Sequence, residues 1–553
     1  MGVVAIEADT ETCPARNVMT ASDEGQKRIN ESRSLIRHTS VVSTMTLLSR
    51  ITGLARDIGF SRWFGAGALM DAFFVAFKIP NLLRRFFAEG AFSAAFVPII
   101  SEYRTTRGLE ETKELVDRVA GTLGLVLFAI TVAGVVAAPI LIMIFAPGFL
   151  DDDGRYELAR DMLRLTFPYL FFISLTALAG AILNAYRSFA VPAFTPVLLN
   201  IVLIGFAGWI APHMENPGLG LAAGVFVAGL VQLLFQLPFL LRLQLLPLPR
   251  WGWGYVGVRR VLKLMAPVIF GSSVAQINIL FDTLIASFLA AGSISWLYYS
   301  DRLMEFPLGV FGIALATVIL PTLSEQHVTA SKEAFTATLD WALRLVLLIA
   351  FPAALGLIVL AEPLLITIFH GGEFTAFDVS MAAASLVAYA LGLVGFILVK
   401  VLTPGYFARQ DTKTPVRIGV FSLLLNMFLN VVLVISLVRV GFYAPHAGLA
   451  LATTLSALFN AALLLRGLRK SDVYRPQPGW RRLIGQVLVA SAVMTCSIFL
   501  ALDRLGDWIQ FGIFERISAL VICVLIGLGV YFGTCFLLGL RVRSFQKIPM
   551  ANL

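Results

Sequence analysis

The chain has 553 residues, of which 58% are apolar and only 14% are charged, whereas an ordinary soluble protein is about 45–50% apolar even with glycine counted. A soluble single-core enzyme is excluded, because the polar surface is too small to solvate a body of this size. The net charge of +9 does not indicate nucleic-acid binding either, since the basic residues interrupt apolar runs instead of gathering on one solvated face. We interpret the chain as a polytopic membrane protein.

The beginning of the chain differs from the rest. Residues 1–34 are polar and mixed in charge, so we predict a cytoplasmic tail without fixed structure. About fourteen apolar segments follow, each long enough for the roughly 30 Å hydrocarbon layer. Because backbone groups in lipid must be satisfied within the segment, runs of this length predict an all-α polytopic membrane protein. The approximate segments are 38–61, 68–100, 116–145, 160–186, 191–211, 219–242, 260–291, 295–323, 338–361, 379–407, 415–438, 446–466, 483–502 and 515–540.

Lysine and arginine are unevenly distributed between the connecting loops. They gather near residues 104–118, 242–263, 409–417 and 466–482, whereas the stretch from Glu362 to Asp378 has none. Since short cytoplasmic loops carry the excess of positive charge, we assign the basic loops to the cytoplasm. With an even number of spans, both termini are predicted to be cytoplasmic.

The sequence also contains an internal repeat, with an offset of about 224 residues. The segment APILIMIF at 138–145 resembles EPLLITIF at 362–369, and Leu198 to Asn200 resembles Leu424 to Asn426. We predict two parallel six-helix lobes around a central cavity. The N-terminal lobe comprises residues 35–243 and the C-terminal lobe residues 244–470. Residues 471–553 add two helices outside the repeat and a short cytoplasmic tail.

Ionisable residues inside the apolar segments are the strongest functional signal. Each one at the bilayer centre costs about 2.5–3.5 kcal/mol on insertion scales, so these side chains must face protein or water. Residues seven apart on a helix share a face, and a proline in the second segment permits a bend that opens a cavity. The residues concerned are Arg50, Arg56 and Asp57; Asp71, Lys78, Arg84, Arg85 and Glu89; Asp282; and Asp301, Arg302 and Glu305.

We predict that the first, second and eighth segments line one basic cavity. Buried ion pairs that hold the lobes together are the alternative interpretation for Asp57, Asp71 and Lys78. In these three segments the basic residues outnumber the acidic ones by six to five, and an anionic substrate explains the surplus. A planar, permanently charged guanidinium can bind two phosphate oxygens, so the cluster suits a pyrophosphate group. The sequence has no nucleotide-binding, metalloprotease or hydrolase motif, so we expect neither an enzyme nor a catalytic metal.

Three charged motifs resemble those of the lipid II flippase (MurJ, MviN) family. They are SRITGLARD at 49–57, DAFFVAFKIPNLLRRFFAEGAFS at 71–93 and DRLMEFP at 301–307. The resemblance implies a fourteen-helix member of the multidrug/oligosaccharidyl-lipid/polysaccharide exporter superfamily in the bacterial cytoplasmic (inner) membrane. It implies that the protein moves lipid II, the undecaprenyl-pyrophosphate-linked disaccharide-pentapeptide, from the inner to the outer leaflet for peptidoglycan synthesis.

The resemblance also assigns roles by position. It implies a lipid-tail groove in the last two helices, and no cofactor beyond coupling to the membrane potential or a monovalent ion. The expected partners are lipid II, membrane lipids and cell-wall synthesis proteins. The implied substrate-binding residues are Arg50, Arg56, Arg84 and Arg302. The implied cavity acids and gating residues are Asp57, Asp71, Lys78, Pro80, Asn81, Glu89 and Glu305. The sodium site of some relatives maps to Asp282, Asn426, Thr453 and Asn430, the last at a position where a carboxylate can occur.

Other functions stay open at this point. The chain could flip another undecaprenyl-pyrophosphate-linked oligosaccharide, or exchange drugs for cations as other members of the superfamily do. A cation antiporter requires surplus carboxylates in its cavity, whereas basic residues are in surplus in the first, second and eighth segments. A non-transporting scaffold for cell-wall enzymes is a third alternative, and it predicts that the cavity arginines can be neutralised without effect.

Overall fold

The computed structural model describes residues 21–85, 91–151, 154–328 and 331–540. Within these ranges the chain is helical, and the only β-type pairing is an isolated bridge between Gly371 and Phe374. The predicted all-α class is confirmed. The first helices are α1 (Ala21–Phe64), α2 (Ala68–Arg84), α3 (Ala91–Thr106), α4 (Gly108–Val136), α5 (Ala138–Phe145), α6 (Arg155–Thr166), α7 (Tyr169–Ala185), α8 (Ala190–Gly205) and α9 (Pro217–Arg242). The later ones are α10 (Val256–Ser287), α11 (Ser293–Pro307), α12 (Ile313–Val328), α13 (Lys332–Val359), α14 (Ala361–Ile368), α15 (Ala376–Ala390), α16 (Leu393–Phe407), α17 (Lys413–Val440), α18 (Ala447–Lys470), α19 (Trp480–Leu505) and α20 (Ile513–Leu537).

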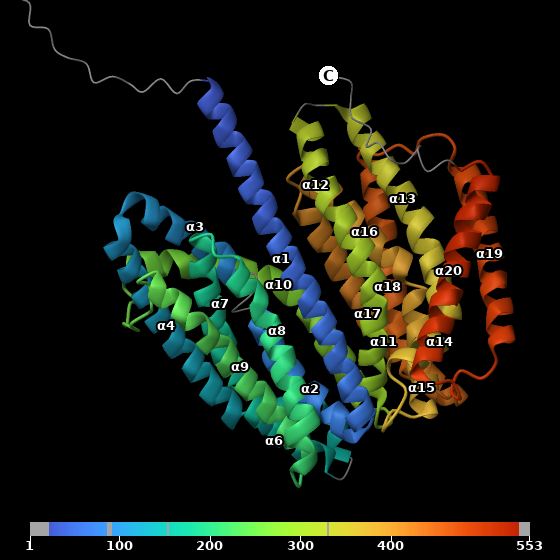
Figure 1. Cartoon of the computed structure of the whole chain (residues 1–553), viewed down its shortest axis with the longest axis horizontal. Coiled ribbons are helices and arrows are strands. Elements are labelled where there is room, and N and C mark those ends of the chain that lie inside the picture. The colour runs from blue at the N-terminus through green and yellow to red at the C-terminus, as the bar shows by residue number, and fades with distance from the viewer. Residues whose placement is uncertain (1–20, 86–90, 152–153, 329–330, 541–553) are drawn as a thin grey trace, which may run out of the picture.

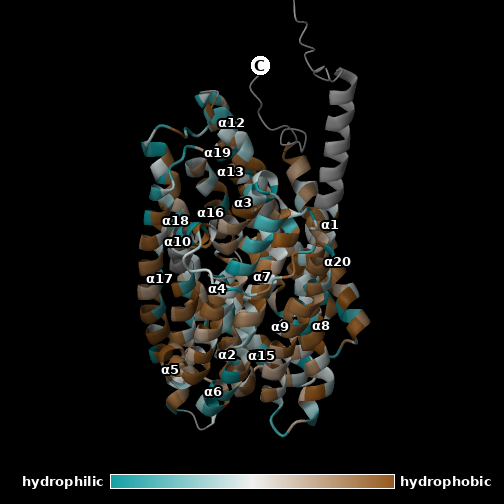
Figure 2. Cartoon of the chain, turned by 90° about the vertical axis from the view of Figure 1, so that its left-hand side faces the viewer, coloured by the Kyte–Doolittle hydropathy of each residue, from teal (hydrophilic) through white to brown (hydrophobic). Residues whose placement is uncertain are grey.

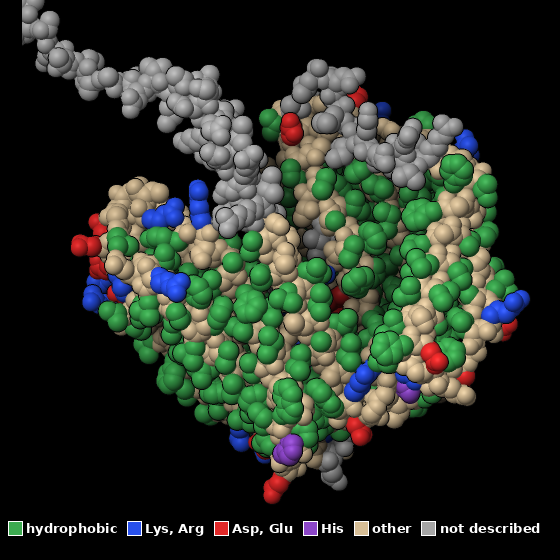
Figure 3. Space-filling view, in the orientation of Figure 1, with side chains coloured by type: hydrophobic (Ala, Val, Ile, Leu, Met, Phe, Trp, Pro, Cys, Tyr) green, Lys and Arg blue, Asp and Glu red, His purple; other side chains and the backbone are tan. Residues whose placement is uncertain are grey.

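Eleven helical segments among the described residues are long and apolar enough to cross a membrane. The predicted segments 38–61, 68–100 and 260–291 are not among these eleven, although α1, α2, α3 and α10 occupy most of their residues. The predicted number of fourteen spans therefore stays a prediction. Figure 3 shows hydrophobic side chains over most of the visible helix flanks, and the colours of Figure 2 show that hydrophobic residues predominate along the helices, as expected for surfaces that face lipid.

Several predicted spans consist of two helices in series. The span 160–186 is divided between α6 and α7, with Pro168 at the junction. The span 295–323 is divided at Pro307, where the π-helical turn η5 (Leu308–Gly312) separates α11 from α12. Proline removes a helix hydrogen bond and clashes with the preceding turn, so it favours such breaks. The break after Pro307 lies two residues beyond Glu305 and so adjoins the predicted site.

The N-terminal segment differs from its prediction. Helix α1 begins at Ala21, so residues 21–34 are helical where we predicted a tail without fixed structure; residues 1–20 lie outside the described residues. Extending an existing helix adds one hydrogen bond for each residue ordered, whereas nucleation is the costly step. A polar segment rich in helix-forming Glu, Gln, Lys and Arg can therefore continue the helix that the apolar part of α1 nucleates.

The helices form two groups that converge at one end of the molecule and separate at the other (Figure 1). One group contains α1 to α9, and the other contains α11 to α18 with α19 and α20 packed against α13 and α14. Helix α10 contacts α3 and α4 of the first group and α11 and α17 of the second. The boundaries of the two lobes at residues 35–243 and 244–470 stay a prediction.

Two buried aspartates support the internal repeat. Asp117 of α4 accepts a hydrogen bond from the backbone N–H of Leu248 (2.8 Å), in the loop that follows α9. Asp340 of α13 accepts one from the backbone N–H of Gln477 (3.2 Å), in the loop that follows α18. The two aspartates are separated by nearly the offset of the sequence repeat. Each group of helices thus fixes its exit loop with an equivalent carboxylate.

Candidate functional site

A cavity of about 420 Å³ lies between α2 of the first group and α10, α11, α15 and α18 of the second. Figure 3 shows the molecular surface hollowed between the two groups of helices. Two tyrosines, several amides and apolar side chains of α2 and α11 complete the lining. The ionisable residues that line the cavity are Lys78, Arg85, Asp282, Asp301, Arg302 and Glu305.

Two of the predicted arginines meet at one buried carboxylate. Arg56 of α1 bonds Asp57 Oδ1 through Nε (3.0 Å) and Nη2 (2.7 Å). Arg302 of α11 reaches Asp57 Oδ2 with its Nε at 3.3 Å. The Asp57 side chain is 3% exposed and that of Arg56 8%, whereas that of Arg302 is 39% exposed. Asp57 therefore fixes both guanidinium groups across the two lobes, and Arg302 is the one that presents its face to the cavity.

Tyr298 joins the same cluster, and our sequence analysis missed it. Its hydroxyl donates to Asp57 Oδ1 (2.9 Å) and accepts N–H groups from Arg56 (3.0 Å) and Arg302 (3.1 Å). The Arg302 guanidinium also lies 4.9 Å from the centroid of the Tyr298 ring. An uncharged residue inside an apolar segment gives no signal comparable with that of an arginine. Its position four residues before Arg302, on the same helix face, is the pattern that could have identified it.

Asn200 of α8 is a second missed residue. Its Oδ1 accepts from Arg56 Nη1 (3.1 Å), and its Nδ2 donates to the backbone oxygen of Ser49 (3.1 Å) and to Thr52 Oγ1 (3.2 Å). Our sequence analysis used Asn200 only as a marker of the internal repeat. A buried amide in an apolar helix requires partners, and this requirement indicated a polar neighbour.

Of the other predicted arginines, Arg50 and Arg85 contact neutral groups. The Arg50 guanidinium lies so close to Gly309 of η5 that a Cβ on this glycine would be 2.7 Å from Nη1. Arg84 donates to Asn81 Oδ1 (2.8 Å), and Arg85 donates to Gln276 Oε1 (3.2 Å). Within the described residues, no carboxylate lies within ion-pair distance of Arg50 or Arg85.

The charges in and beside the cavity do not cancel. Lys78 donates to Thr283 Oγ1 (2.8 Å) and so joins α2 to α10. Among the described residues, and leaving Arg84 aside, five basic side chains and four acidic ones lie in or beside the cavity. The basic ones are Arg50, Arg56, Lys78, Arg85 and Arg302, and the acidic ones are Asp57, Asp282, Asp301 and Glu305. Glu89 lies outside the described residues. The excess of positive charge between the lobes is the feature that a multiply charged anion would complement.

Asp71 does not lie where we predicted it. Its carboxylate is fully buried and accepts the backbone N–H groups of Gly292 (2.8 Å) and Ser295 (2.8 Å) and the Ser295 hydroxyl (2.6 Å). Arg155 approaches it at 3.8 Å. Asp71 therefore caps the N-terminus of α11 and does not line the cavity. The first turn of a helix offers free N–H groups and a positive dipole end, which outweighs the shared face with Lys78 on which our prediction was based.

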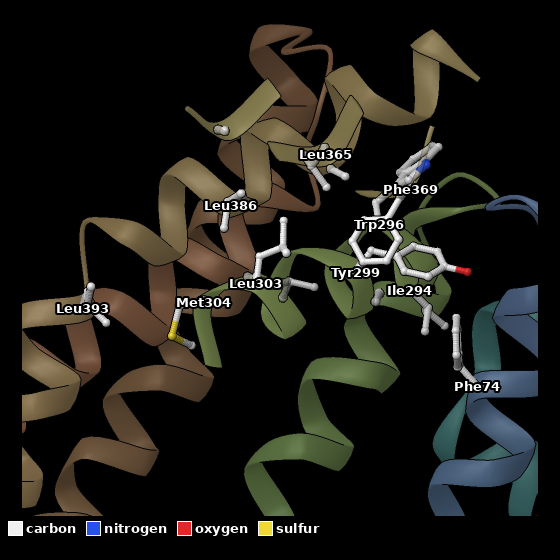
Figure 4. Packing of buried hydrophobic residues seen from close by; sticks show 14 of the residues in the cluster. Phe74, Ile294, Trp296, Tyr299, Leu303, Met304, Leu365, Phe369, Leu386 and Leu393 are labelled. Carbon is white, nitrogen blue, oxygen red and sulfur yellow. The ribbon is translucent and has the colours of Figure 1, made fainter. Parts of the chain in front are cut away.

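This cap belongs to a set of contacts that closes one end of the cavity. Phe74 of α2 stacks on Tyr298 with ring centroids 4.0 Å apart and meets Tyr299 edge-on, and Figure 4 shows Phe74 beside Ile294 and Tyr299. The backbone N–H of Glu373 bonds the Arg62 oxygen (3.0 Å). Gly148 packs so tightly on Ser287 that a Cβ would lie 2.4 Å from its backbone oxygen. The lobes therefore touch through backbone and aromatic contacts at this end.

The four residues predicted to form a sodium site are brought together. Asn430 Nδ2 donates to Asp282 Oδ1 (2.6 Å) and to Asn426 Oδ1 (3.0 Å), and Asn426 Nδ2 donates to Thr453 Oγ1 (3.3 Å). Asn278, one turn before Asp282, donates to its other oxygen (3.4 Å). The side-chain oxygens of Asn430 and Asn278 are buried and accept no hydrogen bond among the described residues. A carboxylate beside unsatisfied amide oxygens fits a hard cation.

Pro80 and Asn81 complete the predicted set. Pro80 is buried inside α2, which continues through it to Arg84. Asn81 lines the cavity and accepts from Arg84, as described above. The structure thus brings most of the predicted residues to one interface between the lobes and moves Asp71 to its closed end.

A charged cavity between two helical groups, closed at one end, is the arrangement found in membrane transporters that work by alternating access. A solved structure described as the inward-facing conformation of a multidrug resistance MATE family transporter of the MOP superfamily has the same fold. Its TM-score is 0.62, with 14% identity, and the match covers 78% of this chain and 98% of that one.

The family is shown by closer relatives. The model for "Lipid II flippase MurJ" matches residues 60–519. A probable lipid II flippase MurJ of Vibrio cholerae is 48% identical over 94% of this chain and 99% of its own length. The lipid II flippase MurJ of Burkholderia cenocepacia is 43% identical over 93% of this chain and 99% of its own length. A solved lipid II flippase MurJ in an inward closed conformation matches with a TM-score of 0.73 and 27% identity over 90% of this chain and 98% of that one. The chain belongs to the lipid II flippase MurJ family.

Proposed function

We propose that this protein translocates lipid II from the inner to the outer leaflet of the bacterial cytoplasmic membrane, and that its cavity arginines bind the pyrophosphate. The observation that carries the proposal is the excess of basic over acidic side chains in and beside the cavity, with the Arg302 guanidinium held at the cavity by Asp57 and Tyr298. A guanidinium offers fixed, paired N–H donors to phosphate oxygens. The cavity holds no acidic surplus that would suit a drug cation, so the antiporter alternative is disfavoured.

The cavity geometry supports alternating access without covalent chemistry. The lobes are closed at the end where Asp71 caps α11 and separate at the opposite end, where the basic loops around residues 104–118 and 466–482 lie. By the positive-inside rule that open end faces the cytoplasm, with both termini on the same side. The headgroup enters there while the prenyl tail stays in lipid. Rocking of the lobes then exposes the arginines on the other side.

Depletion of the protein from growing cells tests this function. Lipid II is expected to accumulate in the inner leaflet, because the charged headgroup cannot cross the hydrocarbon layer unaided. The measurement is the fraction of lipid II that an externally added, impermeant cleaving enzyme reaches in spheroplasts. The Arg475→Ala variant serves as the complementation control. It removes an ion pair with Asp472 at the surface, where the Arg475 side chain is 78% exposed. An unchanged leaflet distribution after depletion would refute the proposal, and accumulation of a different lipid-linked oligosaccharide would assign another substrate.

We further propose that a monovalent cation binds at Asp282, Asn430, Asn426 and Thr453. The unsatisfied oxygens of Asn430 and Asn278 support this site. A cation that binds only the folded protein stabilises it, and more so at higher cation concentration. Sodium is therefore expected to raise the Tm of the purified protein above its value in N-methylglucamine at equal ionic strength. Asp282→Asn is expected to abolish the difference, whereas Asp161→Asn, at an exposed carboxylate paired with Arg160, should keep it. A sodium effect of full size in Asp282→Asn would exclude the site.

A further inference from the structure

A second, smaller cavity lies on the flank of the molecule, apart from the charged one. It has a volume of about 180 Å³ and is enclosed by α3, α4 and α10. Its lining is apolar side chains with a single hydroxyl, that of Thr122. Phe92, Val126 and Met265 come from the three helices, and Trp253 of the loop before α10 also lines the cavity. A crevice lined almost entirely by apolar side chains, whose one hydroxyl already accepts a hydrogen bond from Gly252, suits a hydrocarbon chain.

The loop that carries Trp253 is held rigidly on α4. Gly252 donates its N–H to Thr122 Oγ1 (3.1 Å), and Arg250 donates its N–H to the Asp117 backbone oxygen (3.0 Å). A Cβ at Gly121 would lie 2.2 Å from the Arg250 oxygen, so only glycine permits this approach. Because the loop is fixed by these bonds, the position of Trp253 over the crevice is built into the fold.

Exposed basic residues lie close in the chain to those that line this crevice. Arg250, Arg259 and Lys263 are exposed, and within the described residues no carboxylate lies within ion-pair distance of any of them. Arg259 and Lys263 are one turn apart on α10, beside the residues that line the crevice. Trp251 stacks on Trp253 with ring centroids 6.0 Å apart, and both rings are half exposed. Tryptophan and basic side chains together mark the headgroup level of a membrane.

We propose that this crevice is a binding site for an anionic glycerophospholipid. One acyl chain occupies the apolar space under Trp253, and the phosphate lies among Arg250, Arg259 and Lys263. Basic pockets between membrane helices bind such headgroups, and the charge and the apolar lining complement both parts of the molecule. The site is separate from the transport cavity, because Met265 and Gln276 are eleven residues apart on α10, which corresponds to about 16 Å along a helix.

Thermal unfolding of the full-length protein in a neutral detergent tests this site. Adding phosphatidylglycerol is expected to raise the Tm by several degrees, because a ligand that binds only the folded state stabilises it, whereas phosphatidylcholine should not. The triple variant R250Q/R259Q/K263Q is expected to lose most of this increase. A matched variant, R466Q/K470Q/R481Q, removes the same charge from exposed positions of the other lobe and should keep it.

A second variant distinguishes binding of the acyl chain in the crevice from a general effect of charge. Ala266→Phe fills the crevice without changing any charge, and it should weaken the phosphatidylglycerol effect as strongly as the triple variant does. Equal responses to both lipids, or a full response in Ala266→Phe, would overturn the proposal. An equal response to soluble glycerol phosphate would show a free phosphate site instead. A response to undecaprenyl phosphate alone would identify a substrate site. None of these variants alters a residue of the transport cavity.

Discussion

Replacing Arg302 by alanine is expected to reduce translocation of lipid II by about 100-fold or more. Removing one partner of a desolvated charge contact costs roughly 2–5 kcal/mol, and about 1.4 kcal/mol corresponds to tenfold. Arg302 presents its guanidinium to the cavity while Asp57 and Tyr298 hold it in place. The measurement is headgroup translocation in vesicles reconstituted with purified protein, at matched amounts of inserted protein.

Two further variants make this result specific. Arg302→Lys keeps the charge but loses the fork that bonds two phosphate oxygens, so it should retain part of the activity. Tyr298→Phe removes the hydroxyl that both Arg56 and Arg302 contact and should have a smaller effect than Arg302→Ala. If Arg302→Ala moves lipid II at the normal rate, the clamp hypothesis is wrong, and the scaffold alternative gains support.

Replacing Asp71 by alanine is expected to open the closed end of the cavity. The carboxylate accepts three hydrogen bonds from Gly292 and Ser295, and buried donors left without partners cost about 1–3 kcal/mol each. A loss of this size shifts the equilibrium between the closed and the open state of this end by tenfold or more. The readout is the labelling rate of a cysteine at Ile294, which is buried against the cavity, by an impermeant thiol reagent added outside.

The controls for Asp71 test whether the opening is local. Asp161→Ala removes an exposed carboxylate of α6 and should leave the labelling rate unchanged. Ser295→Ala removes only one of the three donors and should give a smaller increase in the labelling rate. This variant also tests the assignment if the Asp71→Ala protein fails to insert into the membrane. Labelling that is equally slow in all variants would contradict the assignment of Asp71 to the closed end.

Composition and motifs were sufficient to predict the class of fold and to single out the charged residues that line the cavity. A charge in a lipid-spanning segment is costly, so its presence in the sequence already indicates an interior cavity. Arg56, Arg302 and Lys78 were identified for this reason, and the structure places them at one interface. The sodium candidates came from the resemblance alone, and the structure brings Asp282, Asn430, Asn426 and Thr453 into one hydrogen-bonded chain.

The tertiary structure alone decided which partner each charge takes. Spacing along one helix predicted that Asp71 shares a face with Lys78, but Asp71 bonds Gly292 and Ser295 at the start of α11. Asp57 bonds both its neighbour Arg56 and Arg302 of α11. Tyr298 and Asn200 could not be singled out, because a neutral polar residue has little cost in an apolar segment until its neighbours are known. Hydropathy is a local property and was therefore readable from the sequence. The pairing of buried polar groups depends on which helices touch, and only the packed lobes determine that.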